Sequence, residues 1–435
     1  MEKLFKLKEH NTTVRTEILA GITTFFAMAY IIFVNPSFLQ ATGMEYTAVL
    51  VATCVSAAIG SALTAFLSNT PFAQAPGMGL NAFFTYTVCL GMGYTWQQGL
   101  AIVFLSGVLF LLVAVSPLRS KIIASIPASL KAAISAGIGL FVTLVGLLNA
   151  GIVVTSGTVL DLGVITKGAP LLALIGVVIT GILMAWKVKA ALILGIVITT
   201  VIGIPMGVTT FPEHITMESI SMSSTFLKLD FAGLGTLGLL PLVTAIVTFS
   251  ICDCFDTVGT LIGTAGNAGM LDKDGNLPGG DRALIADAVA TCTGALLGTS
   301  TVTTFVESST GIAEGGRTGL TSLTTSVLFL LAIFLAPIAG IIPSAATAPA
   351  LIIVGMLMIG NVTRIDWSDM EVALPCFLTV AVMPFGYSIS DGIGFGIISY
   401  TLIKLFRGKA KEVPVLMYVL SALFIAAFVL SNLGA

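Results

Sequence analysis

Charged residues are scarce in this chain of 435 residues: they make up 9% of it, against about 25% in ordinary globular domains. Hydrophobic residues make up 56%, which argues against a large soluble enzyme and predicts a polytopic membrane protein. Histidine is nearly absent, with two residues, and both lie outside the apolar segments. The six cysteines lie in or beside apolar segments and lack the spacing of a zinc site, so we predict no metal and no cofactor.

What the sequence has in abundance is apolar runs. A membrane-spanning helix needs about 20 largely apolar residues, and thirteen stretches meet or approach that length. These are 18–36, 46–68, 97–116, 128–149, 168–186, 189–207, 236–263, 282–298, 318–339, 345–362, 370–387, 389–406 and 415–432.

Two further stretches, 71–91 and 300–315, are interrupted by Pro, Gly, Ser and Thr and are predicted to be the third and tenth crossings. Each begins with a short extended run and continues as a helix, which is predicted to start at Ala75-Pro76-Gly77 in the first. Seven crossings separate them, an odd number, so the two halves of the chain would be inverted relative to each other. Paired interrupted segments of this kind indicate a transporter's binding site, because extended backbone at membrane depth needs hydrogen-bonding partners.

The positions of Lys and Arg predict the orientation. With the N-terminus inside and fourteen crossings up to residue 407, 17 of the 19 Lys and Arg residues fall on the cytoplasmic side, as the positive-inside rule requires. The apolar run 415–432 either spans the membrane or lies in its interface. We divide the chain into a cytoplasmic leader 1–17, a first repeat 18–207, an extracellular loop 208–235, a second repeat 236–407 and a hydrophobic extension 408–435.

Four acids are predicted at membrane depth, Asp253, Asp256, Asp287 and Glu307, where a charge costs about 2.5–3.5 kcal/mol on insertion scales. No Lys or Arg lies in these helices to pair with them, which favours a functional role for Asp256 and Glu307. A structural and a functional role stay equally open for Asp253 and Asp287. The i, i+3, i+7 spacing of Asp253, Asp256 and Thr260 places them on one helix face. With no histidine in the spans, carboxylates would have to carry any transported proton.

Four motifs, in order, resemble the azaguanine-type (AzgA-like) purine permeases, a branch of the nucleobase/ascorbate transporter superfamily. They are QAPGMGLNAFF (74–84), CFDTVGTLIGTAGNAGM (254–270), RALIADA (282–288) and TTFVESSTGIAEGGRTGL (303–320). The resemblance covers nearly the whole chain. It implies an all-α polytopic fold of fourteen transmembrane segments in two inverted repeats of seven, with short antiparallel strands breaking the third and tenth. It also implies a core domain (18–116 plus 236–339) that moves like an elevator against a gate domain (128–207 plus 345–407).

The activity implied is proton-coupled import of purine bases such as hypoxanthine, guanine or adenine across the inner membrane. By the resemblance, Asp256 contacts the base, Thr260 takes the place where uracil-type relatives carry a histidine, and Glu307, Asn81 and Asp287 match the remaining functional positions. Proton coupling is assigned to Glu307, Asp256, Asp287 and Asp253. The implied partners are the purine, protons and lipid, with no nucleic acid, and relatives suggest a homodimer through the gate domain.

A purine is flat and carries both donors and acceptors. Backbone groups of the two strands, predicted near Phe72–Ala75 and Thr304–Val306, would bond its edge, and Phe72 and Phe305 are candidates to stack on its face. Ala75 and Thr304 are therefore included among the predicted substrate contacts.

Two other functions are weighed against this one. An inorganic-anion exchanger or channel of related fold would need a positive site, where this chain has acids. A membrane-embedded hydrolase would need a base to activate Ser or Cys, and none is visible.

Overall fold

A computed structural model of the protein describes residues 2–117, 125–156, 159–210, 220–272 and 277–433. The middle of the predicted extracellular loop, 211–219, and the two ends of the chain lie outside these residues. The described chain is mostly helical. Its helices are α1 (Glu2–Phe5), α2 (Val14–Met28), α3 (Ile31–Leu39), α4 (Tyr46–Leu63), α5 (Met78–Ala82), α6 (Trp96–Val115), α8 (Ala128–Asn149), α9 (Gly168–Ala185), α10 (Ala191–Gly203), α11 (Leu239–Asn267), α12 (Gly280–Leu297), α13 (Ser308–Ala313), α14 (Gly319–Ala332), α15 (Ala336–Ala339), α16 (Ser344–Ile359), α17 (Met370–Phe385), α18 (Ile389–Phe406) and α19 (Val415–Leu433).

Shorter elements extend or join these helices. Two π-helical segments continue α4 and α5, and 3₁₀ turns mark several helix ends. The segments are η1 (Gln40–Thr42), η2 (Thr64–Ser68), η3 (Phe83–Gly91), η5 (Ala232–Leu237), η6 (Ile333–Leu335), η7 (Gly360–Arg364) and η8 (Ala410–Glu412); the strands are β1 (Gln74–Pro76), β2 (Val153–Ser156), β3 (Val159–Leu162) and β4 (Val302–Thr304).

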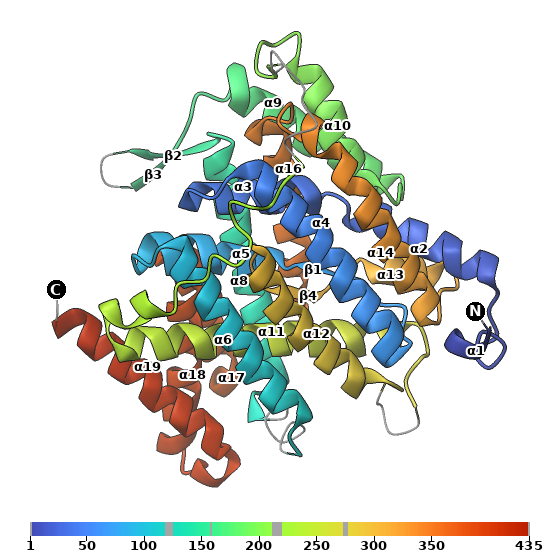
Figure 1. Ribbon diagram of the computed structural model, residues 1–435. Coiled ribbons are helices and arrows are strands. Elements are labelled where there is room, and N and C mark those ends of the chain that lie inside the picture. The colour runs from blue at the N-terminus through green and yellow to red at the C-terminus, as the bar shows by residue number, and fades with distance from the viewer. Residues whose placement is uncertain (1, 118–124, 157–158, 211–219, 273–276, 434–435) are drawn as a thin grey trace.

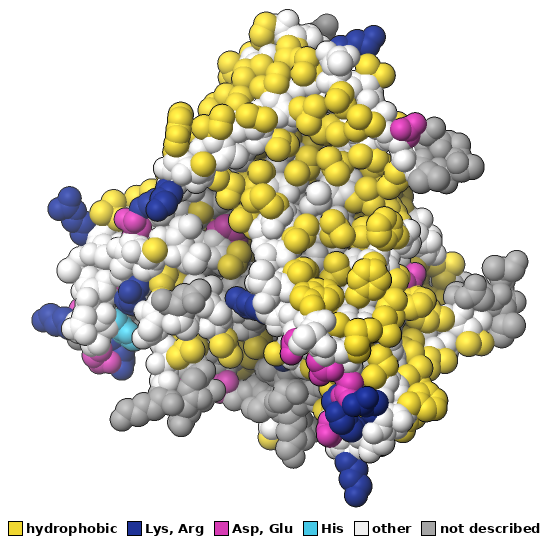
Figure 2. Space-filling model, turned by 180° about the vertical axis from the view of Figure 1, so that it is seen from behind, with side chains coloured by type: hydrophobic (Ala, Val, Ile, Leu, Met, Phe, Trp, Pro, Cys, Tyr) yellow, Lys and Arg dark blue, Asp and Glu magenta, His cyan; other side chains and the backbone are white. Residues whose placement is uncertain are grey.

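Eight helical stretches among the described residues are long and apolar enough to cross a membrane, and four shorter apolar helices accompany them. Figure 2 shows hydrophobic side chains covering much of one face, with charged side chains gathered towards its lower end and one side. Several large side chains in these helices are exposed, including Phe385 at 83% and Phe406 at 85%, as expected where lipid is the solvent. The protein is therefore a multi-pass membrane protein, while the count of fourteen crossings stays a prediction.

The helix contacts fall into two main sets. In one, α2 and α4 pack against α14, and α6 and α4 pack against α12. In the other, α8 packs against α16 and α17, α9 against α10, and α18 against α17 and α19. Helix α19 corresponds to the apolar run 415–432, which was predicted either to span the membrane or to lie in its interface. Its buried side chains include Met417, Leu420 and Phe424. The predicted division into a core and a gate domain stays a prediction.

Strands β1 and β4 lie near the middle of the molecule (Figure 1) and pair antiparallel, with Gln74 opposite Thr304 and Pro76 opposite Val302. The positions differ slightly from the predicted ones. Pro76 ends β1 instead of opening a helix, and α5 begins two residues later at Met78. Since proline lacks an N–H, it fits the end of a two-stranded ribbon, where no further strand needs that donor.

The β2–β3 hairpin was not predicted. Val153–Ser156 pairs antiparallel with Val159–Leu162 between α8 and α9, and it projects from the body of the molecule (Figure 1). Its β-branched residues favour strand, but the segment is too short to stand out beside the apolar runs around it.

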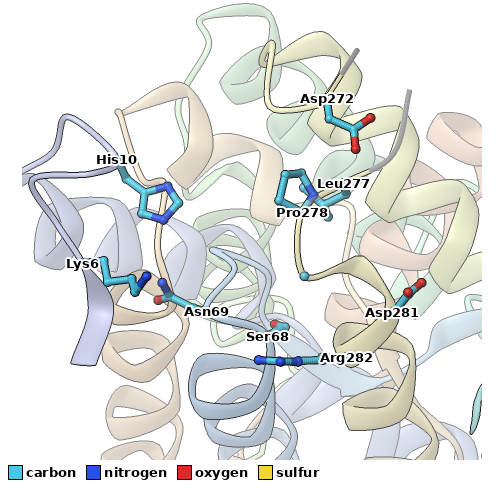
Figure 3. Close-up of a pocket in the computed structure, with 10 residues that line it drawn as sticks. Lys6, His10, Ser68, Asn69, Asp272, Leu277, Pro278, Asp281 and Arg282 are labelled. Atoms are coloured by element: carbon cyan, nitrogen blue, oxygen red, sulfur yellow. The ribbon is translucent and has the colours of Figure 1, made fainter. Parts of the chain in front are cut away.

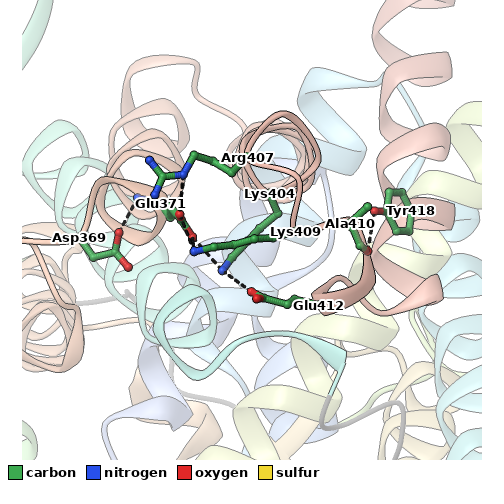
Figure 4. A network of polar contacts seen from close by, with 8 residues as sticks. All are labelled: Asp369, Glu371, Lys404, Arg407, Lys409, Ala410, Glu412 and Tyr418. Atoms are coloured by element: carbon green, nitrogen blue, oxygen red, sulfur yellow. Dashed lines mark hydrogen bonds and ion pairs between the residues drawn. The ribbon is translucent and has the colours of Figure 1, made fainter.

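A charged network joins the ends of α17 and α18 (Figure 4). The Glu371 carboxylate at the start of α17 lies 2.9 Å from Lys404 Nζ, 3.0 Å from Arg407 Nε and 2.8 Å from Lys409 Nζ. Lys404 also pairs with Glu412 at 2.9 Å. The shared carboxylate ties the last turn of α18 to the first turn of α17, so this end of the helix pair is fixed by charge as well as by packing.

Candidate functional site

The site is built around the two strands, whose backbone groups are satisfied inside the protein. Gly77 N donates to Thr301 O at 2.9 Å and Phe305 N to Ala73 O at 3.0 Å, which extends the pairing beyond the strands. A side chain at Gly77 would put its Cβ 2.5 Å from Thr303 Cγ2. Glycine is therefore required for the strands to approach this closely.

Hydroxyl groups from neighbouring helices complete the hydrogen bonding of the first interrupted segment. Ser61 Oγ of α4 accepts from Gln74 N at 2.9 Å, and Ser308 Oγ of α13 accepts from Ala73 N at 3.0 Å. Ser322 Oγ of α14 lies 2.8 Å from Phe72 O. Protein groups thus satisfy the extended backbone, as is required of backbone that is not helical inside a membrane.

Asp256 and Glu307 are the least buried of the four acids predicted at membrane depth. Asp256 is exposed on α11, and Glu307 is half-buried at the N-cap position directly before α13. The two carboxylates act on each other electrostatically. Thr260, one turn after Asp256, is also partly exposed. Of the predicted substrate contacts, these three are the ones with exposed surface.

Asp253 and Asp287 are buried next to the strand pair, with side-chain exposures of 1% and 0%. Asp287 Oδ1 accepts from Gln74 Nε2 of β1 at 3.0 Å and from Thr304 Oγ1 of β4 at 2.8 Å. Asp253 Oδ2 accepts from Thr291 Oγ1 of α12 at 2.8 Å. Both acids are therefore attached to the strand pair and its supporting helices.

The remaining predicted contacts are all interior. Phe72 is 0% exposed and packs in a hydrophobic cluster that includes Phe110 and Leu261, and Phe305 is 5% exposed. Ala75 is buried within β1. In this conformation neither ring presents an open face, so their stacking roles stay predictions.

Asn81 lies on α5, just beyond β1. Its Oδ1 accepts from Ser300 Oγ at 2.7 Å, while its buried Nδ2 has no hydrogen-bond partner among the described residues. The side chain thus bridges the two interrupted segments and retains one unused donor.

Two residues that the sequence reading missed touch the predicted acids. The Tyr30 hydroxyl donates to Glu307 Oε1 at 2.7 Å, and Gln74 donates to Asp287. Gln74 opens the QAPGMGLNAFF motif, so its place in the motif was an available signal. Tyr30 sits inside an apolar run, and only the fold brings it to Glu307.

A cavity of about 730 Å³ lies away from these residues, between the N-terminal arm and the start of α12. Figure 3 shows Lys6 and His10 on one side of it, Asp281 on the other, and Arg282 between them beside Ser68. None of the predicted site residues lines it. Among the described residues no group of three or more His, Cys, Asp or Glu side chains could hold a metal ion.

Comparison with known proteins gives a consistent result. A family profile described as "Permease family" matches residues 15–395. The chain is 41% identical over 430 residues to the adenine permease AdeP of Escherichia coli strain K12, covering 99% of this chain and 96% of the relative. It is 43% identical over 439 residues to the guanine/hypoxanthine permease PbuG of Bacillus subtilis, covering 99% of each. The solved transmembrane domain of a cyanobacterium bicarbonate transporter, BicA, matches with a TM-score of 0.62 at 15% identity, covering 89% and 97%, which shows a shared fold alone.

Proposed function

Because the chain belongs to the permease family, among the nucleobase/ascorbate transporters, we propose that it imports purine nucleobases in symport with protons. The substrates proposed are hypoxanthine, guanine and adenine, since the adenine and the guanine/hypoxanthine permeases are similar to it over nearly their whole length. We place it in the cell membrane with its N-terminus in the cytoplasm, and as a dimer through the gate domain.

One observation carries the proposal. Asp256 is exposed on α11 and Glu307 is half-buried three residues after β4, and their carboxylate oxygens could accept hydrogen bonds from a purine's ring or exocyclic N–H groups. Hydrogen bonds to charged acceptors are about twice as strong as neutral ones. A site that relies on them rejects solutes lacking the donors, because its own groups are then left unpaired.

Movement of the core group of helices against the gate group would carry the bound purine across the membrane. The strand pair travels with the core in this scheme, since β1 packs on α4 and β4 on α11 and α12. The charged network at Glu371 ties gate helices to each other, which suits a gate that stays rigid while the core moves.

The fold similarity to a bicarbonate transporter favours a second candidate, an anion exchanger. A bound anion would need positive charge, whereas the open side chains here are those of Glu307 and Asp256. We therefore rank anion exchange below purine import.

Uptake into proteoliposomes containing the purified protein separates the two. We expect labelled hypoxanthine to accumulate when the outside is acidic and adenine, guanine and hypoxanthine to compete for it, while uracil and bicarbonate do not. A protonophore should abolish accumulation when the sodium gradient is kept. Bicarbonate exchange without purine uptake would contradict the proposal, and sodium-driven accumulation would replace its coupling ion.

A further inference from the structure

Three aromatic rings from distant parts of the chain meet in one cluster. Tyr86 lies on η3, Phe141 on α8, and Tyr387 in the turn between α17 and α18. The centroid of the Tyr86 ring lies 6.2 Å from that of Phe141 and 5.7 Å from that of Tyr387, and the latter two lie 5.2 Å apart. Their interplanar angles of 54° to 74° are those of edge-to-face and tilted pairs, which attract each other.

This ring cluster connects the two main sets of helix contacts. Segment η3 packs against α6, which belongs to the first set, whereas α8, α17 and α18 belong to the second. Phe141 is 0% exposed and Tyr86 8%, while Tyr387 keeps 38% of its surface exposed. Tyr387 therefore lies at the edge of the cluster, and the other two rings fill the space between the sets.

The backbone at Tyr387 is in a conformation that a side chain disfavours. Its φ of 52° lies in the left-handed region, where the Cβ crowds the following carbonyl oxygen. Ser388 N donates to Met383 O at 3.1 Å, which is the bond that closes a helix after a left-handed residue, and glycine is the usual residue there. Gly386, one position earlier, is right-handed. A tyrosine in the place that suits glycine indicates that its ring has a function.

The position of the cluster relative to the membrane follows from its contact with α3. The Phe38 ring, near the end of α3, lies 5.8 Å from the Tyr86 ring. Helices α2 and α3 belong to one apolar stretch, Val14–Thr42, that is long enough to cross a membrane, so Phe38 lies at the end of this crossing opposite to its start. With the N-terminus in the cytoplasm, as proposed above, the cluster lies towards the outer face.

The cluster also lies on the outer side of the strand pair. Ile138 of α8 is 7% exposed, and a side chain at Gly79 of α5 would collide with it. The contacts of Gly79 with Ile138 and of Tyr86 with Phe141 come in the same order along both segments, so α8 runs beside α5 and η3 in the direction that leads away from β1. Ile138 is therefore placed between β1 and the rings.

We propose that Tyr86, Phe141 and Tyr387 form an outer gate, which closes when the rings meet and opens when the two helix sets move apart. The proposal rests on the proposed function, because import requires a site that is first reached from outside and then closed to it. In the present conformation the rings meet and the gate is closed. Tyr387 lies in a turn between two helices, so it can leave the cluster without unfolding either helix.

Thiol labelling tests the gate without any purine. A cysteine introduced by Ile138→Cys would report access from outside, in right-side-out membrane vesicles treated with a membrane-impermeant maleimide, after subtraction of the labelling of the protein without that cysteine. Tyr387→Gly removes the ring and suits the left-handed backbone. It should raise the labelling rate at least about fivefold, since two ring pairs that favour the closed state are lost. Tyr387→Phe keeps the ring and should be labelled at the parent rate.

A second variant guards against misfolding at the turn. Tyr86→Leu removes a ring from a helical position and should also raise the labelling rate, because it too removes both ring contacts across the two sets. Phe395→Ala of α18 is the matched control. Its ring lies 5.3 Å from that of Phe428 on α19, outside the cluster, so its loss should leave the labelling rate unchanged.

The outcomes separate a gate from a merely structural cluster. An unchanged labelling rate in Tyr86→Leu, or in Tyr387→Gly that unfolds at the parent temperature, would overturn the proposal. An equal rise in Tyr387→Phe or Phe395→Ala would also overturn it, because general loosening would then explain the access. Purine counterflow is measured separately in the same vesicles. Its absence in the parent protein would defeat the proposed function, whereas the labelling rates would still decide whether the rings close this face.

Discussion

Two acids on one helix, three residues apart, have opposite surroundings. Asp253 is 1% exposed and bonded to Thr291, whereas Asp256 is exposed beside Glu307. The helix period places them on the same side of α11, but α12 covers Asp253, whereas Asp256 keeps exposed surface. The difference teaches that the exposure of a carboxylate is set here by the neighbouring elements, which leave Asp256 and Glu307 partly exposed and bury Asp253 and Asp287.

The largest effect that would sharpen this comparison is expected from Glu307→Gln. Replacing one carboxylate oxygen by an NH₂ group turns an acceptor into a donor facing the purine's own N–H. A lost hydrogen bond to a charged group costs about 1.5–3 kcal/mol, and the new clash of donors adds to that, so uptake should fall at least about a hundredfold. Transport assays on equal amounts of inserted protein check this. Uptake at the parent level would remove Glu307 from the site.

Asp256→Asn should have the next largest effect. Asn keeps one carbonyl oxygen that can accept from the base, so we expect a rise in KM of about tenfold, near the lower part of the range for a hydrogen bond to a charged group. Initial-rate kinetics over a range of purine concentrations would measure it. If the KM does not change, the open acids are not equivalent and Glu307 binds the purine without Asp256.

A smaller effect is expected from Tyr30→Phe, which removes the hydroxyl that holds Glu307 Oε1 at 2.7 Å. Tyr30 acts only through Glu307, so the KM should rise about threefold to tenfold, and the pH profile of uptake should shift. Tyr46→Phe is the matched control, since its hydroxyl bonds Phe33 O at 3.4 Å, a contact without an acid. Equal effects of the two substitutions would mean that Tyr30 is structural.

Glu412→Gln should have the smallest effect. Its carboxylate is 57% exposed and pairs with Lys404, which Glu371 also holds. Exposed ion pairs contribute less than about 1 kcal/mol, so thermal stability should hardly change and the KM should stay at the parent value. A changed KM would show that the charged network at Glu371 affects purine binding. The exposure of the four acids alone would then not explain which residues matter for binding.

Much of the architecture was predictable from the sequence because long apolar runs and their interruptions have direct physical causes. The ranges 46–68, 128–149 and 389–406 coincide with α4 and η2, α8 and α18. The family resemblance carried by four motifs is confirmed by the family match and by relatives more than 40% identical. The crossing count, the domain boundaries and the inverted repeats stay predictions.

The site was only partly predictable, because burial depends on which elements pack together. The spacing of Asp253 and Asp256 does not predict which of the two is buried. The residues around Tyr30 in the sequence do not predict its contact with Glu307. Phe72 was a reasonable stacking candidate by type, yet its ring is enclosed by Phe110 and Leu261 in this conformation. Such outcomes depend on contacts between residues far apart in the chain.

Direct binding of a labelled purine to the purified protein tests the central claim most closely, because it needs no gradient and no transport step. The parent, Glu307→Gln and Asp253→Asn would be compared side by side at one pH, with thermal unfolding as a check on folding. The account predicts that binding is lost in Glu307→Gln and kept in Asp253→Asn. Binding that survives in Glu307→Gln and is lost in a folded Asp253→Asn would contradict it, since the closed acid and not the open one would then hold the purine.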